Sequence, residues 1–232
     1  MKRFYAAAAV EEAEGGFRVT LDGRAVKTQG GRPQIVPTRA LAELLAGEWA
    51  AQGQELDPAG FPFRDFADYA IDQVRQDRAE CVAALLAYAE TDTLCYRAEA
   101  DDPLHSRQHD LWEPLLAAAE VRHGVRFARA SGIVHRPQPA DTLATLRDAL
   151  EGENPFTLAA LRSLASLAAS LTVALAALDP EADVPALFAA ANAEEDWQAE
   201  QWGWEWTAED RRARRFADFE RAAAFARAAR PS

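Results

Sequence analysis

The stretch GGFRVTLDGRAVKT, residues 15–28, decides how the front of the chain folds. Apolar Phe17, Val19 and Leu21 alternate with polar residues, which is the two-residue period of a half-buried β-strand. Asp22-Gly23 then separates two strand-like runs, and Asp-Gly is a strong signal for a two-residue hairpin turn. The sequence therefore predicts a β-rich N-terminal part that contains a hairpin.

The rest of the chain has mainly helical patterns. Thr38 is a candidate N-cap for a helix that Gly53 ends, and Asn154-Pro155 opens a long apolar helix. We predict an α+β fold, with an N-terminal β-rich domain ending in a helix (1–55) and a helical domain (56–232). Short strands are expected over 34–36 and 125–130, and helices around residues 38–53, 66–74, 82–89, 111–124, 155–178, 184–202 and 207–229.

Composition excludes several classes of protein. The 232 residues carry a formal net charge of -12, which argues against a general nucleic-acid binder because such proteins need a basic surface. The longest apolar run, 163–178, is shorter than the roughly 20 residues of a membrane span. Cys81 and Cys95 form no CxxC pair, which fits a reducing cytoplasmic compartment. Acidic residues follow MKRFYAAAAV at 1–10, so we do not interpret this segment as a secretion signal.

Catalytic signals are weak. The sequence has no GxGxxG, P-loop, GxSxG or HExxH motif. His105 and His109 would share a helix face, but no third ligand has supporting spacing, so we favour a solvated face over a metal site. We expect no enzyme activity, no cofactor and no metal. The alternative is an enzyme that uses Asp92, His105 or the acidic cluster near the C-terminus.

The most unusual segment is EEDWQAEQWGWEW at 194–206, with four tryptophans among five carboxylates. As part of one helix over 184–206, it would place Trp202 and Trp197 on nearly opposite sides. Tryptophans rimmed by polar groups are typical of binding hot spots, so the segment predicts a partner-binding surface. The alternative is that the arginine-rich residues 211–215 fold back over this helix and pair with its carboxylates.

Six segments together resemble a known family. In order and spacing they are similar to the assembly chaperones for the F1 head of ATP synthase, specifically the factor that binds the alpha subunit. The resemblance runs from residue 2 to about residue 206. The segments are KRFY (2–5), GGFRVTLDGRAVKT (15–28), PTRALAELLAGEWAAQG (37–53), TDTLCYRAE (91–99), LWEPLLAAAEVRHGV (111–125) and EEDWQAEQWG (194–203).

The resemblance implies a β-rich N-terminal part, a larger helical part and a non-enzymatic role. The protein would hold an unassembled alpha subunit and shield the surface that later meets a beta subunit. We expect a bacterial cytoplasmic protein and, by default, a monomer; an interaction protein with a different client is the alternative. The central motif would supply either a second contact or a structural turn. The expected partner-binding residues are Glu194, Glu195, Gln198, Trp202 and Trp197, with Asp92 and Arg97 as the candidate second contact.

Overall fold

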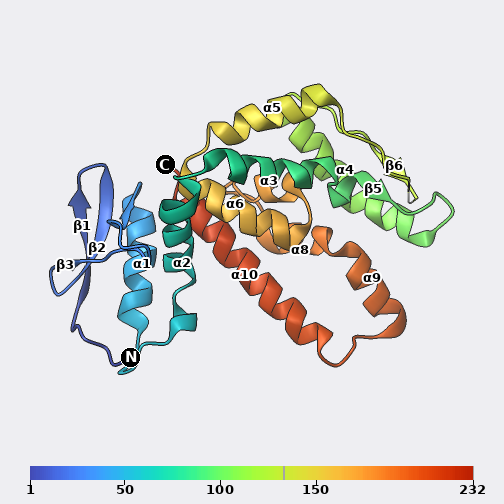
Figure 1. The fold of residues 1–232 in the computed structure, drawn as a ribbon. Coiled ribbons are helices and arrows are strands. Elements are labelled where there is room, and N and C mark those ends of the chain that lie inside the picture. Colours follow the sequence, from blue (N-terminus) through green and yellow to red (C-terminus); the bar gives the residue numbers. More distant parts are fainter. Residues whose placement is uncertain (133, 232) are drawn as a thin grey trace. The chain divides into compact units, whose positions relative to one another are not determined.

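The computed structural model describes residues 1–132 and 134–231, and the chain divides into two compact units (Figure 1). Unit 1 contains residues 1–81, 153–160 and 224 to the C-terminus. Unit 2 contains residues 82–152 and 161–223. This division by contacts falls at different residues from the boundary expected near residue 55. Whether residues 1–55 form a domain of their own remains a prediction.

The first four strands precede the first helix, as predicted, while two further short strands lie among the helices. The strands are β1 (Ala8–Ala13), β2 (Gly16–Leu21), β3 (Arg24–Ala25), β4 (Ile35–Val36), β5 (Tyr96–Arg97) and β6 (Ala130–Ser131). The helices are α1 (Arg39–Ala51), α2 (Pro62–Tyr69), α3 (Arg78–Glu90), α4 (Pro103–His123), α5 (Ala140–Glu151), α6 (Pro155–Ala168), α7 (Leu171–Ala176), α8 (Val184–Ala191), α9 (Ala193–Trp202) and α10 (Ala208–Ala228). The predicted α+β class is confirmed.

Strand β2 is the centre of the sheet in unit 1, where it pairs antiparallel with β1, β3 and β4. The predicted hairpin is confirmed, because Leu21 pairs with Arg24 and both turn residues, Asp22 and Gly23, have positive φ. Helix α1 packs against β1 and β2. Strand β1 was not predicted, because its alanine-rich sequence lacks a clear two-residue alternation.

The cap of α1 was predicted correctly. The Thr38 hydroxyl oxygen accepts a hydrogen bond from the Leu41 amide at 3.1 Å. Leu41 and Leu45 are fully buried on one side of the helix. The helix ends at Ala51, two residues before the glycine that was expected to close it.

Helix α4 forms the centre of unit 2, since it packs against α7, α8 and α9. Trp112 and Leu116 have no exposed surface, and the Trp112 indole N–H donates to the Ala190 carbonyl at 2.7 Å. Gly124 ends the helix in the left-handed region, as its sequence position predicted. Phe188 of α8 packs on two aromatic rings of α10, with centroid distances of 5.2 and 5.4 Å.

Two predictions of long helices were wrong. The helix expected through 155–178 breaks at Ala169, which has a φ of 48°, and Ser170 caps α7 by accepting from the Val173 amide at 3.0 Å. The break frees the Ala169 carbonyl to accept from both the amide and the hydroxyl of Thr93. A pairing across the chain therefore overrides the local helix preference.

The helix expected over 184–202 was wrong as one continuous helix, although its predicted end at Trp202 is correct. It breaks at Asn192 and ends at Trp202, followed by Gly203 with a φ of 80°. Of the strand expected over 125–130, only Ala130 lies in a strand, β6. Trp197 and Trp202 both lie on α9, five residues apart, so their separation of about 140° around one helix is retained. Trp204 and Trp206 lie beyond its end, so the face expected to continue through 206 does not form.

Substitution of Gly16 by alanine tests the close packing of β2 against β4, and the same substitution at Gly47 is the control. A Cβ on Gly16 would lie 2.1 Å from the Val36 carbonyl oxygen, and its φ of 151° disfavours other residues. We expect Gly16→Ala to lower the free energy of unfolding by at least about 2 kcal/mol. Gly47→Ala, in open space within α1, should raise it by roughly 0.5–1 kcal/mol. Urea unfolding measures both, and equal effects would contradict this packing.

Glu48 should make stability depend on pH. Burial raises the pKa of its carboxyl to about 7, against hydrogen bonds from the Phe63 and Arg64 amides that favour the charged form. Since the unfolded chain releases this proton nearer 4.5, the folded state loses stability as pH rises from 4.5 to about 7. The full shift corresponds to about 3 kcal/mol, which partial exposure reduces to roughly 1–2 kcal/mol.

Glu48→Gln removes this titration. Between about pH 5 and about pH 8, the variant should lose less stability than the parent, by roughly 1–2 kcal/mol in urea unfolding. Glu43→Gln, an exposed position on the same helix, is the control and should follow the parent at both pH values. Parallel curves for Glu48→Gln and the parent would show that Glu48 titrates normally.

Candidate functional site

Helix α9 carries most of the acidic, tryptophan-rich segment, and α10 anchors it. The Arg215 guanidinium pairs with the Glu195 carboxylate at 3.0 Å and donates to the Asn192 side-chain oxygen at 2.6 Å. Asn192 is buried at the break between α8 and α9, and its side-chain N–H donates to the Phe188 carbonyl. The alternative in which residues 211–215 fold back onto this helix is therefore confirmed.

A second arginine of α10 makes the stronger contact. Arg212 donates two hydrogen bonds to the two oxygens of Asp196, at 2.9 and 2.6 Å, and both side chains are mostly buried. The same guanidinium lies 4.6 Å from the centroid of the Phe188 ring. A bidentate, partly desolvated pair fixes geometry better than an exposed one. The position of α9 within unit 2 is therefore fixed by the Arg212–Asp196 ion pair and by the stacking of Arg212 on the Phe188 ring.

Glu194 is held from α4. Its carboxylate accepts a hydrogen bond at 2.7 Å from the side-chain N–H of Gln108, which is fully buried. The oxygen of Gln108 in turn accepts from the Ala98 amide at 2.7 Å. One amide side chain therefore joins the central motif, residues 91–99, to the acidic pair Glu194-Glu195.

Arg107 holds the far end of α9. It forms two hydrogen bonds to the Glu200 carboxylate, at 2.5 and 2.7 Å, and lies 5.7 Å from the Trp197 ring centroid. Hydrogen bonding to Arg107 lowers the pKa of Glu200. Trp197 is only partly exposed, so this arginine covers one of the expected contact residues.

The segment Trp202–Trp206, which we call the tip, presents aromatic surface to solvent. Trp202 is 80% exposed and Trp206 is 90% exposed, whereas Trp204 is partly covered and lines a small pocket of about 250 Å³ with Arg107. Gln198 is also exposed. Exposed tryptophans are costly in water, so the tip has the character of a contact surface.

The central motif is mostly internal. Asp92 has no exposed surface, and its carboxylate accepts from the Leu94 and Thr172 amides at 3.1 and 2.9 Å. Burial raises the pKa of Asp92, while these hydrogen bonds oppose the shift. Arg97 pairs with Glu113 in α4, and that hydrogen bond lowers the pKa of the Glu113 carboxyl. These positions favour the structural alternative for both residues.

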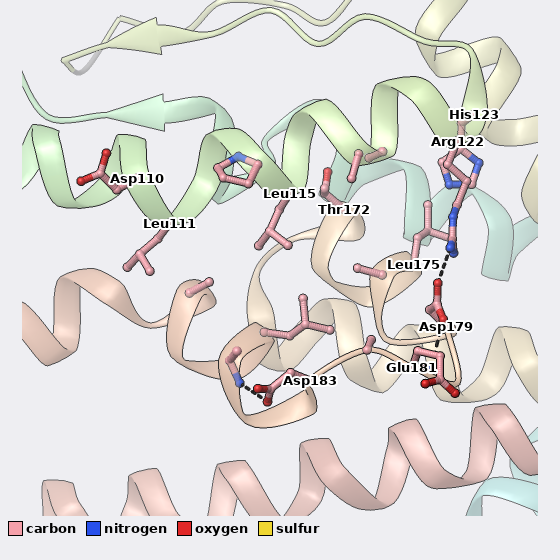
Figure 2. A pocket seen from close by; sticks show the side chains of 18 residues that line it. Asp110, Leu111, Leu115, Arg122, His123, Thr172, Leu175, Asp179, Glu181 and Asp183 are labelled. Carbon is pink, nitrogen blue, oxygen red and sulfur yellow. Dashed lines mark hydrogen bonds and ion pairs between the residues drawn. The ribbon is translucent and has the colours of Figure 1, made fainter.

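An apolar groove borders the face of α4 next to the one that carries buried Trp112. Figure 2 shows its lining side chains. Its volume is about 480 Å³, and Leu111 and Leu115 point from α4 toward the segment that carries Asp183. Its walls are Asp110, Leu111, Pro114, Leu115, Ala118, Ala119, Arg122 and His123 of α4, Thr172, Leu175 and Ala176 of α7, Asp179, Glu181, Ala182 and Asp183 of the connection, and Ala186, Leu187 and Ala190 of α8.

Other kinds of site find little support. Within residues 1–132 and 134–231, no group of three histidine, cysteine or acidic side chains is placed to hold a metal ion. His105 and His109 share α4, and His109 lies 3.6 Å from the Asp110 carboxylate. Among the helices that the structure describes, none combines the length and apolar character of a transmembrane span.

Comparison with known proteins agrees with this architecture. The model of the ATP12 chaperone protein family matches residues 2–120. Mitochondrial protein atp12 of Schizosaccharomyces pombe is 27% identical over 214 residues, which is 87% of this chain and 74% of that protein.

Solved structures extend the match over nearly the whole chain. The crystal structure of Atp12 from Paracoccus denitrificans is 34% identical, with a TM-score of 0.93 over 99% of this chain and 98% of that one. A protein from Agrobacterium tumefaciens is 37% identical, with the same TM-score over 99% of this chain and 86% of that one. An exposed aromatic tip on a helical scaffold is consistent with a chaperone. The chain belongs to the ATP12 chaperone family, whose role is in ATP synthase assembly.

Sequence reasoning placed Glu194, Glu195, Gln198, Trp197 and Trp202 in one region, and the structure brings them together on α9. It missed the residues that position them. Gln108 and Arg107 lie far away in the sequence and resemble ordinary polar positions of a helix. The sequence did suggest that the acidic residues of 194–206 pair with the nearby arginines 211–215. This identified α10 as a support for α9, but it gave no indication of α4.

Arg212 and Arg214 provide a test of how α9 is held. Arg212→Ala should lower the free energy of unfolding by roughly 1–3 kcal/mol, because it leaves the mostly buried carboxylate of Asp196 without its partner. It should also speed amide hydrogen exchange in 193–202. Arg214→Ala, at an exposed neighbouring position, should change stability by less than about 0.5 kcal/mol. Indistinguishable variants would show that the Arg212 pair does not anchor the helix.

Proposed function

We propose that this chaperone binds the unassembled alpha subunit of the ATP synthase F1 sector through the tip and the exposed face of α9. It shields the beta-facing surface of the alpha subunit until the head assembles. The proposal extends to the cell biology expected from the sequence: a non-enzymatic, monomeric protein of the bacterial cytoplasm. Its support is membership of the ATP12 family together with the character of the exposed surface.

One observation carries the proposal, namely the exposure of Trp202 and Trp206 next to anchored carboxylates. A free subunit that awaits its neighbour presents apolar surface, which favours aggregation. Tryptophan side chains bury a large area against such a surface. The carboxylates of Glu194 and Glu195 provide directional contacts at the rim, where charge contributes more to specificity and association rate than to affinity.

The arrangement also explains how the client can be released. The carboxylates of α9 already have partners within the chain, including Arg215 and Gln108. They are therefore satisfied before the client arrives and after it leaves. Binding then depends mainly on the apolar contact, which the incoming beta subunit can replace with a larger interface.

Substitutions in the tip should weaken binding without unfolding the protein. Trp202→Ser and Trp206→Ser remove exposed side chains, so the free energy of unfolding should be nearly unchanged. Together they should weaken binding to the purified alpha subunit by at least about 2 kcal/mol, which is roughly 30-fold in affinity. Val121→Ser, at an 86% exposed position of α4, is the matched control. Titration calorimetry with alpha and with beta, each expressed alone, measures the effect.

Charge reversal tests the acidic pair. Glu194→Lys and Glu195→Lys, separately and together, should reduce capture of the alpha subunit, whereas Glu209→Lys at an exposed position of α10 should not. Circular dichroism of each variant checks the fold, because Glu195 also pairs with Arg215. Undiminished capture by both the tip and the charge variants would remove this surface from the function. Failure of the parent protein to capture free alpha subunit would refute the client itself.

A further inference from the structure

The groove on α4 is an apolar surface that the packing of unit 2 leaves open. The sequence pattern of Leu111, Leu115 and Ala119 is that of a buried helix face. The structure instead buries the neighbouring face, through Trp112, and leaves Leu111 38% exposed in the groove. The volume of about 480 Å³ lies within the range of clefts that bind ligands. The chain thus maintains a second apolar stripe on α4 beyond what its own core uses.

A proline interrupts the hydrogen bonding of α4 at the groove wall. Pro114 lies inside α4 and has no N–H to donate to the carbonyl of Asp110, four residues earlier. Both residues line the groove. A proline in a helix interior costs about 3 kcal/mol, so this position is expensive for α4 alone.

The charges around the groove are mainly negative. Asp110 stands at one end, and Glu181 and Asp183 lie on the opposite wall (Figure 2). Arg122 is paired with Asp179, so its charge is already neutralised. Burial and the nearby Arg122 charge lower the pKa of His123, which favours its neutral form. An occupant with positive charge beside its apolar part complements this rim.

The groove also continues the surface that holds α9. Arg107, which pairs with Glu200, precedes Leu111 by four residues on the same helix. At about 1.5 Å per residue, the two lie roughly 6 Å apart along the axis. A partner that contacts the exposed face of α9 therefore needs only a short extension along α4 to enter the groove.

We propose that the groove binds a second segment of the client, a short apolar stretch flanked by lysine or arginine. Its apolar side chains contact Leu111, Leu115 and Ala118, while its cationic groups face Asp110 and Glu181. This inference rests on the proposed function, because the occupant belongs to the same alpha subunit that the tip contacts. The groove adds apolar area to the interface, and its acidic rim selects which segment of the client enters.

Filling the groove tests the apolar contact. Ala118→Trp places an indole at an exposed position of the groove wall, and Val121→Trp places the same group at an exposed position outside it. We expect Ala118→Trp to weaken binding of the purified alpha subunit by at least about tenfold, and Val121→Trp to leave it unchanged. Unfolding curves and circular dichroism confirm that both variants fold.

Charge reversal tests the rim. The double variant of Asp110→Lys and Glu181→Lys should weaken binding about tenfold or more at low salt and less at high salt. Asp101→Lys with Asp148→Lys, two exposed acidic residues of unit 2 outside the groove, makes the same change in net charge and is the control. Equal effects of the two double variants would assign the loss to net charge and overturn the rim contact.

A photo-crosslinking residue at position 111 identifies the occupant directly, with position 121 as control. We expect capture of one client segment that is apolar with flanking lysine or arginine, found by mass spectrometry of the digested adduct. If the parent binds the alpha subunit, yet Ala118→Trp binds as tightly and position 111 gives no adduct, the groove inference is wrong and the proposed function stands. If the parent binds no alpha subunit, both fail together.

Discussion

The hydrogen bonds of Gln108 are the constraint on which the candidate site depends. A buried amide side chain must satisfy both its donor and its acceptor, because an unpaired polar group in the interior costs several kilocalories per mole. Gln108 meets this requirement by joining the Ala98 amide to the Glu194 carboxylate. The central motif, helix α4 and the start of α9 are therefore fixed relative to one another within unit 2. Two sequence segments that lie about a hundred residues apart form one polar connection.

Opposite charges organise the rest of the surface. Arg212, Arg215 and Arg107 each hold one carboxylate of α9, so the acidic helix is bound on more than one side by the chain itself. Trp202 and Trp206 of the tip receive no such cover, and Gly203 turns the backbone at the end of α9. The carboxylates of the segment have partners within the chain, while the side chains of Trp202 and Trp206 remain open to a partner. This division of roles answers why so many tryptophans lie among so many carboxylates.

Local sequence signals predicted the parts of the fold that local chemistry determines. Asp22-Gly23, Thr38 and Gly124 have turn and cap preferences that need no distant partner, and all three were confirmed. The breaks at Ala169 and Asn192 were missed because their causes are distant. The Ala169 carbonyl meets Thr93, and the Asn192 side chain meets Arg215. Alanine-rich sequence around both breaks favours a continuous helix, and tertiary hydrogen bonds override that preference.

The same limit applies to the candidate site. Its acidic and aromatic residues were visible as a cluster in the sequence, but their orientation was not, because it depends on the turn at Gly203 and on arginines of α4 and α10. Leu111 and Leu115 marked a helix in the sequence, but periodicity identifies an apolar face without showing what covers it. Only the packing of Trp112 on the neighbouring face reveals that this stripe borders a groove.

The arginine clamps on α9 also have an entropic consequence. Glutamate and arginine side chains lose up to about 2 kcal/mol of rotamer freedom each when they are fixed. Here the Arg212–Asp196 and Arg107–Glu200 pairs lose that freedom when the chain folds. The polar part of the surface is therefore preorganised, and little further ordering is required of it at the encounter with another protein. The two exposed indoles have only two side-chain torsions each, so ordering them on binding costs little conformational entropy.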